Sequence, residues 1–206
     1  YAKAPQYWDE LYKIAGDITK KTDAGTIQKS ALPFGEYRNV NGAKAILSTL
    51  ILQAGGNITP RDTAGNLVSA ISPRTGETTQ STANALRFYT EFADPSKPHY
   101  TWNRALPEAR KSFAAGDLAL YIGNASEEPL IRRMNPNLNF TVSAVPQIRG
   151  AARAVVTGYV YGLAVPRTSS NPSGAAVVAF DLAGAEMSRA LSTALGLPFL
   201  VARHEA

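Results

Sequence analysis

The chain has 206 residues, no cysteine and a formal net charge of +5 at pH 7. The absence of cysteine excludes disulfide frameworks, thiol catalysis, iron–sulfur clusters and zinc sites built from thiolates. A hydrophobic share of 45% with 18% charged residues is typical of a folded chain with a core, and no apolar run is long enough for a membrane-spanning helix. Lysine and arginine occur singly or in doublets, which indicates a basic solvated surface and no nucleic-acid partner.

The first quarter of the chain is predicted to form two helices and a short strand. A first helix is predicted to begin at Pro5, a residue tolerated in a first helical turn, and its apolar face at spacings of three and four is made by Trp8, Leu11, Ala15 and Ile18. Residues 31–37 are short and aromatic and predict a strand, which Pro33 places at a sheet edge. Residues 44–53 are apolar nearly all round, which predicts a buried helix, and the Gly-Gly pair that follows ends it.

The middle of the chain predicts a hairpin, two helices and a strand. Residues 57–71 carry a polar turn between apolar residues and favour a hairpin. Residues 79–92 predict a helix whose buried stripe comprises Ala83, Leu86, Tyr89 and Ala93. A short helix over 107–115 is closed by Gly116, and a strand follows over 117–122.

The last third alternates again between helical and extended patterns. Residues 130–134 predict a short helix, and residues 140–145 and 159–165 predict strands that end at prolines. Helices over 175–183 and 185–195 complete the pattern. The alternation of helices and short strands predicts an α/β fold.

Few residues carry recognisable enzyme chemistry. No zinc-protease, nucleophile-elbow, P-loop or dinucleotide-binding motif is present, and His99 and His204 lie far apart in the sequence. We therefore predict no catalytic residues, no metal site and no cofactor. The acidic pair Glu127-Glu128 leaves an acid–base role open as an alternative.

An ordered set of landmarks crosses most of the chain. Residues 113–123 read F-x-x-G-x-x-A-x-x-x-G, followed by Val145-Pro146 and Gly158-Tyr159. Upstream, residues 5–11 read P-x-x-W-D-E-L, before the buried helix that ends in Gly-Gly. This order resembles the bacterial extracellular (family 1) solute-binding proteins of ABC importers, in the class that holds sugar and maltodextrin receptors.

The resemblance implies a fold and an organisation. It implies a periplasmic-binding-protein-like α/β lobe of the type II class, within an incomplete two-lobe architecture. Residues 1–153 would form the second lobe. Residues 154–206 would form the crossing strand and the helices that normally return to the first lobe, which is missing. We expect the segment from residue 158 onward to be displaced or loosely packed, because a strand buried on both faces needs neighbours.

The resemblance also implies where a solute binds. Open α/β sheets place ligands beyond the carboxyl ends of strands, and the candidates therefore lie in three loops. The first loop offers Phe34 and Tyr37 as aromatic platforms and the polar residues Glu36, Arg38, Asn39 and Asn41. The second offers Asn124, Ser126 and Glu127, and the third offers Gly158, Tyr159 and Tyr161. Each tyrosine of the third loop has core packing as its alternative.

The implied function is an extracytoplasmic solute receptor, in the periplasm or on the cell surface as a lipoprotein, that serves the permease of a bacterial ABC transporter. A sugar or polyol is favoured. A tryptophan that many sugar-binding members carry after Gly123 is absent, so a smaller or non-sugar solute is also open. The alternatives are an α/β enzyme domain, such as a glycoside-processing hydrolase, and an interaction domain without a ligand. One lobe covers one side of a solute, so we expect weak binding by this chain alone.

Overall fold

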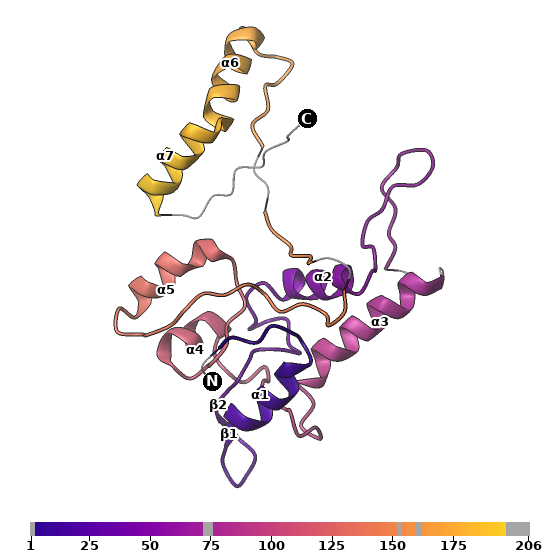
Figure 1. Cartoon of the computed structure of the whole chain (residues 1–206), viewed down its shortest axis with the longest axis vertical. Coiled ribbons are helices and arrows are strands. Elements are labelled where there is room, and N and C mark those ends of the chain that lie inside the picture. The colour runs from indigo at the N-terminus through magenta and orange to yellow at the C-terminus, as the bar shows by residue number, and fades with distance from the viewer. Residues whose placement is uncertain (1–2, 72–75, 152–153, 160–161, 197–206) are drawn as a thin grey trace. The chain divides into compact units, whose positions relative to one another are not determined.

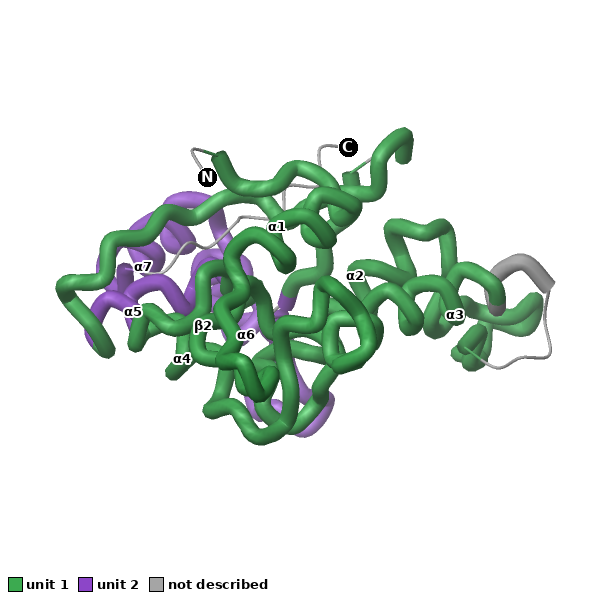
Figure 2. The backbone as a smooth tube through the Cα atoms, turned by 90° about the horizontal axis from the view of Figure 1, so that it is seen from below, with its two compact units in different colours: residues 1–123, 134–158 green, residues 124–133, 159–206 purple. Residues whose placement is uncertain are grey.

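A computed structural model of the chain describes residues 3–71, 76–151, 154–159 and 162–196. The chain divides into two compact units, each described here by itself (Figure 2). Unit 1 comprises residues 1–123 and 134–158, and unit 2 comprises residues 124–133 and 159–206. Within the described ranges, no helix combines the length and the apolar character needed to cross a membrane.

Every predicted helix is confirmed (Figure 1), although α1 begins at Glu10 and leaves Pro5 outside the helix. Unit 1 contains α1 (Glu10–Ile18), β1 (Lys20–Lys21), β2 (Ile27–Lys29), α2 (Ala43–Gln53), α3 (Gly76–Glu91) and α4 (Ala109–Ala115). Unit 2 contains the 3-10 helix η1 (Ala125–Glu127), nearly all of α5 (Glu128–Met134), α6 (Pro172–Ala183) and α7 (Ala185–Leu195).

The core of unit 1 surrounds an extended segment, residues 31–34, whose side chains are fully buried. Phe34 contacts rings from two sides: its centroid lies 6.0 Å from that of Trp8, 5.1 Å from that of Tyr89 and 5.6 Å from that of Phe92. Helix α1 adds Leu11, Ile14 and Ala15, and α2 adds Ile46, Leu50 and Ile51. The aromatic rings therefore join the start of α1 to the last turns of α3.

The predicted strands over 31–37, 117–122 and 140–145 are wrong as strands. The described residues form one two-stranded antiparallel sheet, β1–β2, and a few isolated bridges, among them parallel ones that join Ser30 to Leu118 and Tyr7 to Gln147. Residues 30–31 exchange backbone hydrogen bonds with 117–120 on one side only. A ladder needs successive partners, and these pairings stop after a bridge.

The Thr101 hydroxyl satisfies the other side of the extended segment. Its Oγ1 accepts a hydrogen bond from the Ala31 N–H at 3.0 Å and lies 2.8 Å from Thr19 Oγ1 and 3.0 Å from Ser30 Oγ. The Ser30 hydroxyl in turn donates to the Thr101 carbonyl at 2.7 Å. Buried backbone groups need partners, and here side-chain hydroxyls supply them in place of a strand.

The buried stripe of α3 differs from the predicted one by a small rotation. Ala83 and Leu86 are exposed, whereas Ala85, Tyr89 and Phe92 are buried. The buried positions follow the spacing of four and three that a helix face requires. The predicted hairpin over 57–71 is confirmed, with an antiparallel bridge between Arg61 and Leu67.

Unit 2 exposes much of its apolar surface. Asn171 caps α6 by accepting a hydrogen bond from the Gly174 N–H at 2.9 Å. Phe180 is 78% exposed, and no described side chain of α6 or α7 is buried. The predicted buried strand over 159–165 is wrong for its described residues, because Tyr159 is 70% exposed and Leu163 is 59% exposed. The assignment of residues 1–153 and 154–206 to separate lobes stays a prediction.

Replacement of Thr101 by valine tests the hydroxyl cluster. Valine keeps the shape and removes the nearer of two acceptors of the buried Ala31 N–H, together with the hydroxyl partner of Ser30 and Thr19, so we expect a loss of about 1–3 kcal/mol in the free energy of unfolding. Denaturant unfolding measures it. Thr90→Val, on the exposed face of α3, is the matched control and should change stability by less than about 0.5 kcal/mol. Equal effects of the two variants would contradict the role given to Thr101.

The burial of His99 leads us to expect that the stability of the chain depends on pH. It packs between Tyr12 and Phe92, and burial is the main reason why the pKa of His99 lies below its usual value. Lys97 acts in the same direction, and Glu91 and Asp94 oppose it. As the pH falls, the unfolded chain therefore binds a proton at this histidine before the folded chain does. The free energy of unfolding is highest above about pH 6.5, the ordinary pKa of histidine, and decreases as the pH falls below it. We expect unfolding measurements between pH 7.5 and 5.5 to show a shallower decline for His99→Gln, whereas equal slopes would contradict this.

Candidate functional site

The first predicted loop leaves the core through a turn that only glycine permits. Gly35 has a φ of +93°, and a Cβ there would collide with the backbone and side chain of Ala93 at the end of α3. Glycine adopts positive φ without a steric penalty. The loop over residues 36–41 therefore starts from a fixed point against α3.

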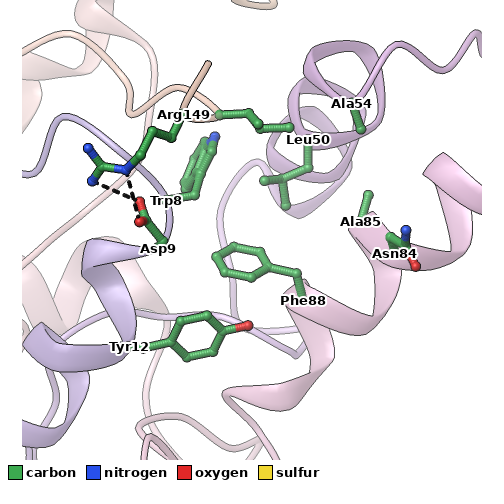
Figure 3. Close-up of a pocket in the computed structure, with 10 residues that line it drawn as sticks. Trp8, Asp9, Tyr12, Leu50, Ala54, Asn84, Ala85, Phe88 and Arg149 are labelled. Atoms are coloured by element: carbon green, nitrogen blue, oxygen red, sulfur yellow. Dashed lines mark hydrogen bonds and ion pairs between the residues drawn. The ribbon is translucent and has the colours of Figure 1, made fainter. Parts of the chain in front are cut away.

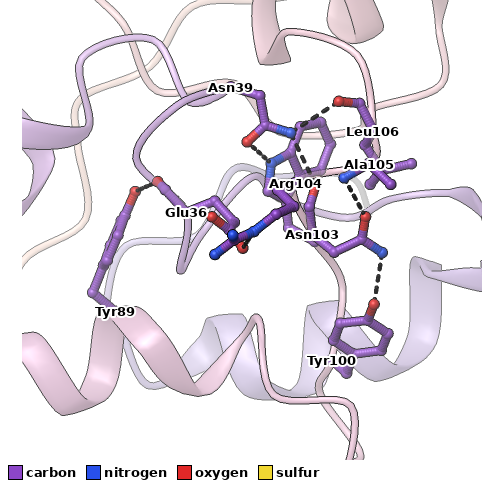
Figure 4. A network of polar contacts seen from close by, with 9 residues as sticks. Glu36, Asn39, Tyr89, Tyr100, Asn103, Arg104, Ala105 and Leu106 are labelled. Carbon is purple, nitrogen blue, oxygen red and sulfur yellow. Dashed lines mark hydrogen bonds and ion pairs between the residues drawn. The ribbon is translucent and has the colours of Figure 1, made fainter.

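Asn39 fastens this loop to the segment over residues 102–106 (Figure 4). Its side-chain amide donates to the carbonyls of Asn103 and Leu106, each at 2.9 Å. Its side-chain oxygen accepts from the Trp102 indole N–H at 3.2 Å. Both polar atoms of the Asn39 side chain are thus engaged within unit 1. The structure assigns this residue to holding the loop, where the sequence predicted a ligand contact.

Asn41 has a similar part at the other end of the loop. Its side-chain oxygen accepts from the Arg110 backbone N–H at 3.0 Å, and its amide donates to the Glu108 carboxylate. That hydrogen bond is the main reason why the pKa of Glu108 lies below its usual value, and Arg110 and Lys111 add to it. Asn41 therefore joins the loop to the start of α4.

Ahead of Asn39 the loop presents the carboxylate of Glu36 and the ring of Tyr37, and Arg104 of the neighbouring segment adds a guanidinium. Glu36 Oε1 lies 3.4 Å from Arg104 Nε, and the Tyr89 hydroxyl donates to the Glu36 carbonyl at 2.7 Å (Figure 4). Burial, and then the charge of Glu36, raise the pKa of Tyr89, which keeps that hydroxyl a neutral donor. Next to Glu36, Tyr37 is 76% exposed. We call Glu36, Tyr37 and Arg104 the Glu36–Arg104 surface.

Much of the hydrogen-bonding capacity of this surface is unused. Among the residues that the structure describes, Glu36 Oε2 and the terminal nitrogens of Arg104 have no hydrogen-bond partner. The Arg104 side chain is 76% exposed and that of Glu36 is 17% exposed. A carboxylate accepts and a guanidinium donates. The surface can therefore hold a ligand that offers both donors and acceptors.

The remaining predicted residues divide by unit and by exposure. Phe34 is fully buried among core rings, so it presents no face to a solute in this structure. Arg38 is exposed on the first loop, and Gly158 is exposed in unit 1. In unit 2, Asn124 and Glu127 form a capping box in which Glu127 Oε1 accepts from the Asn124 N–H at 3.0 Å. Ser126 and Tyr159 are exposed, and Tyr161 lies outside the described residues.

Sequence reasoning missed Arg104 and the carbonyls of Asn103 and Leu106. The sequence feature that could have indicated Arg104 is the Trp-Asn-Arg run in a polar loop before Pro107. Nothing in one sequence pairs that run with a loop more than 60 residues earlier. Trp102 is 1% exposed and belongs to the core.

If Asn39 anchors the loop, removal of its amide donors should lower the stability of the chain. Asn39→Asp keeps the acceptor for Trp102 and removes both amide donors, which leaves the carbonyls of Asn103 and Leu106 without this partner. We expect a decrease of about 1–3 kcal/mol in the free energy of unfolding, measured with denaturant. The exposed Asn139, changed to Asp, is the matched control for the added charge. Loss of the same size in both variants would contradict the anchoring role.

Comparisons with known proteins concern the chain as a whole. The family described as bacterial extracellular solute-binding protein matches residues 1–183. A similar solved structure is an ABC transporter solute-binding protein from Thermotoga lettingae TMO bound with alpha-D-tagatose, with 20% sequence identity and a TM-score of 0.60. The match covers 97% of this chain and 47% of that chain, so this chain spans about half of its length. A comparison with curated proteins finds no match.

These findings confirm the predicted fold class. The fold is that of a periplasmic solute-binding protein, and the match to about half of the solved chain corresponds to an incomplete lobe architecture. The family consists of binding proteins without enzymatic activity, which removes the hydrolase alternative. Since the family match extends over most of the 206 residues, the chain belongs to the bacterial extracellular solute-binding protein family.

Proposed function

We propose that this chain is part of a solute receptor of a bacterial ABC importer. The receptor binds its solute outside the cytoplasm, in the periplasm or on the cell surface as a lipoprotein, and delivers it to the permease subunits. The family match over residues 1–183 supports this proposal, as does the description of the solved structure as an ABC transporter solute-binding protein. In this proposal residues 1–153 form the second lobe, and residues 154–206 return to a first lobe of the same protein.

The proposed solute is a carbohydrate or a polyol. Support comes from the alpha-D-tagatose in the solved structure and from the Glu36–Arg104 surface. A sugar hydroxyl both donates and accepts, so neighbouring hydroxyls can pair with the carboxylate and the guanidinium together. The exposed ring of Tyr37 offers an apolar face for the C–H groups of a sugar. This combination is the observation that carries the proposal, and it disfavours an interaction domain with a purely aliphatic face.

In unit 1, the residues proposed to contact the solute are Glu36, Tyr37, Arg38, Arg104 and Gly158. The sequence-based candidates Asn124, Ser126, Glu127, Tyr159 and Tyr161 belong to unit 2 and are proposed separately, as contacts on that unit alone. Asn39 and Asn41 are positioning residues, because their side chains hold the loop on which the contacts lie. Phe34 supports that loop from the core.

Closure of two lobes around a solute provides contacts from both sides. The ligand favours the closed form by the free energy of those additional contacts. With contacts from one lobe only, we expect this chain to bind D-tagatose with a dissociation constant of roughly a millimolar or weaker. Nanomolar binding in isothermal titration would contradict the assignment of this chain to one lobe.

A titration with D-tagatose, followed by ¹H–¹⁵N NMR spectra, tests the site. We expect the amide signals of residues 36–38 and 103–104 to shift, because the solute lies against their side chains. Arg104→Ala removes the free donors and should weaken these shifts by at least about fivefold, a loss of about 1 kcal/mol that is ordinary for one hydrogen-bonding group. Arg87→Ala, on the exposed face of α3, is the matched control and should leave them unchanged.

Two results would count against the proposal. If no signal of the 36–41 loop moved with D-tagatose, D-fructose, D-glucose or glycerol at tens of millimolar, the loop would not be a sugar contact. If the two arginine variants behaved alike, Arg104 would have no part in recognition. Circular dichroism of each variant shows whether the fold is retained.

A further inference from the structure

A pocket lies in unit 1, between α1, α2 and α3 (Figure 3). Its volume is about 340 Å³, within the range of small-molecule pockets in proteins. The rings of Trp8, Tyr12 and Phe88 form its walls, and Leu50 and Ala85 are among the aliphatic residues that line it. None of the residues proposed to contact the solute lines this pocket.

The pocket and the Glu36–Arg104 surface use different faces of α3. Phe88 lines the pocket, while the next residue, Tyr89, donates to the Glu36 carbonyl. Consecutive helical residues project about 100° apart. A ligand in the pocket therefore leaves the Glu36–Arg104 surface free, and the two sites can be tested separately.

The acceptors around the pocket are already engaged. Both carboxylate oxygens of Asp9 accept from Arg149, at 3.1 and 3.4 Å. The Trp8 indole N–H donates to Gln53 Oε1 at 2.6 Å, so Trp8 offers the pocket only its ring. The Tyr12 hydroxyl donates to Glu91 Oε2 at 3.1 Å, and burial raises the pKa of Tyr12 to about 12, so it stays neutral.

Arg149 and Asn84 lie at opposite ends of the pocket, and the terminal nitrogens of Arg149 point away from the rings of Trp8 and Phe88 (Figure 3). Among the described residues, Arg149 Nη1 has no hydrogen-bond partner, although Nε and Nη2 pair with Asp9 and Glu10. Asn84 accepts from Gln80 through Oδ1 at 2.9 Å and leaves its Nδ2 donors unused. The pocket therefore offers the Asn84 amide as a donor to a ligand that carries a hydrogen-bond acceptor.

The charges at the Arg149 end favour a neutral ligand. The guanidinium is compensated by the carboxylates of Asp9 and Glu10, at 3.1 and 3.5 Å. An anion would meet these carboxylates, and a cation would compete with Arg149 for them. We propose that the pocket binds a small, neutral, aromatic molecule that carries a carbonyl or another hydrogen-bond acceptor. Its ring packs against Trp8 and Phe88, and its acceptor pairs with Asn84 Nδ2.

Benzamide is the probe that tests the pocket in this chain. It has a planar ring and a carbonyl acceptor and carries no charge. In ¹H–¹⁵N NMR spectra we expect benzamide to shift the Trp8 indole N–H signal in a saturable way and to leave that of the buried Trp102 unchanged. Ala85→Leu fills the pocket and should weaken the response at least about tenfold, which is 1.4 kcal/mol of binding free energy. Ala83→Leu, on the exposed side of α3, is the matched control and should bind as the parent chain does.

A comparison of probes on the parent chain keeps the test decisive if Ala85→Leu does not fold. Benzylamine has the same ring, a positive charge and no free acceptor, and should bind at least about tenfold more weakly than benzamide. Equal binding of the two probes would overturn the donor argument. The absence of a saturable Trp8 shift with benzamide, or an equal response in folded Ala85→Leu, would overturn the pocket itself. Neither result would bear on D-tagatose binding at the Glu36–Arg104 surface.

Discussion

The hydroxyl of Thr101 is the contact on which unit 1 depends. Residues 30–32 run through the centre of the core with backbone partners on one side only, in the 117–120 segment. On the other side, Thr101 meets the Ala31 N–H and the hydroxyls of Thr19 and Ser30. This one side chain therefore joins the end of α1, the extended core segment and the chain that leads to Arg104. The segments that lead to Glu36 and to Arg104 both start from this junction, so it helps to fix where these two residues lie.

The helices were predictable because their signals are local. Apolar spacing indicated α1, a segment apolar nearly all round indicated α2, and glycine at a positive φ ends α4 at Gly116 as expected. The extended segments were misjudged, because a strand exists only through its neighbours. Residues 31–34 have the composition of a buried strand, yet hydroxyl groups from distant Thr19 and Thr101 supply their partners. Such pairings, across 12 and 70 residues, leave no pattern in one sequence.

The sequence predicted solute contacts in the loop over residues 34–41, and that prediction stays untested, but the structure shows which partners the side chains of this loop have in the folded chain. Asn39 and Asn41 have the chemistry of ligand contacts, and the structure uses both as fasteners. Phe34 has the chemistry of a platform and lies in the core. Arg104, which completes the surface, comes from a loop 68 residues away. Residue type indicates what a side chain can do, and the neighbours brought by the fold determine which of these it does.

The close approach of Gly35 to Ala93 has a consequence for how this loop can diversify. The backbone of the loop packs closely against the end of α3 at Gly35, and the hydrogen bonds of Asn39 hold it to the 102–106 segment. Its backbone course is therefore shared by any variant that keeps these residues. A receptor built on this scaffold would change its cargo by exchanging the exposed side chains at 36–38, with the main chain retained as an invariant frame.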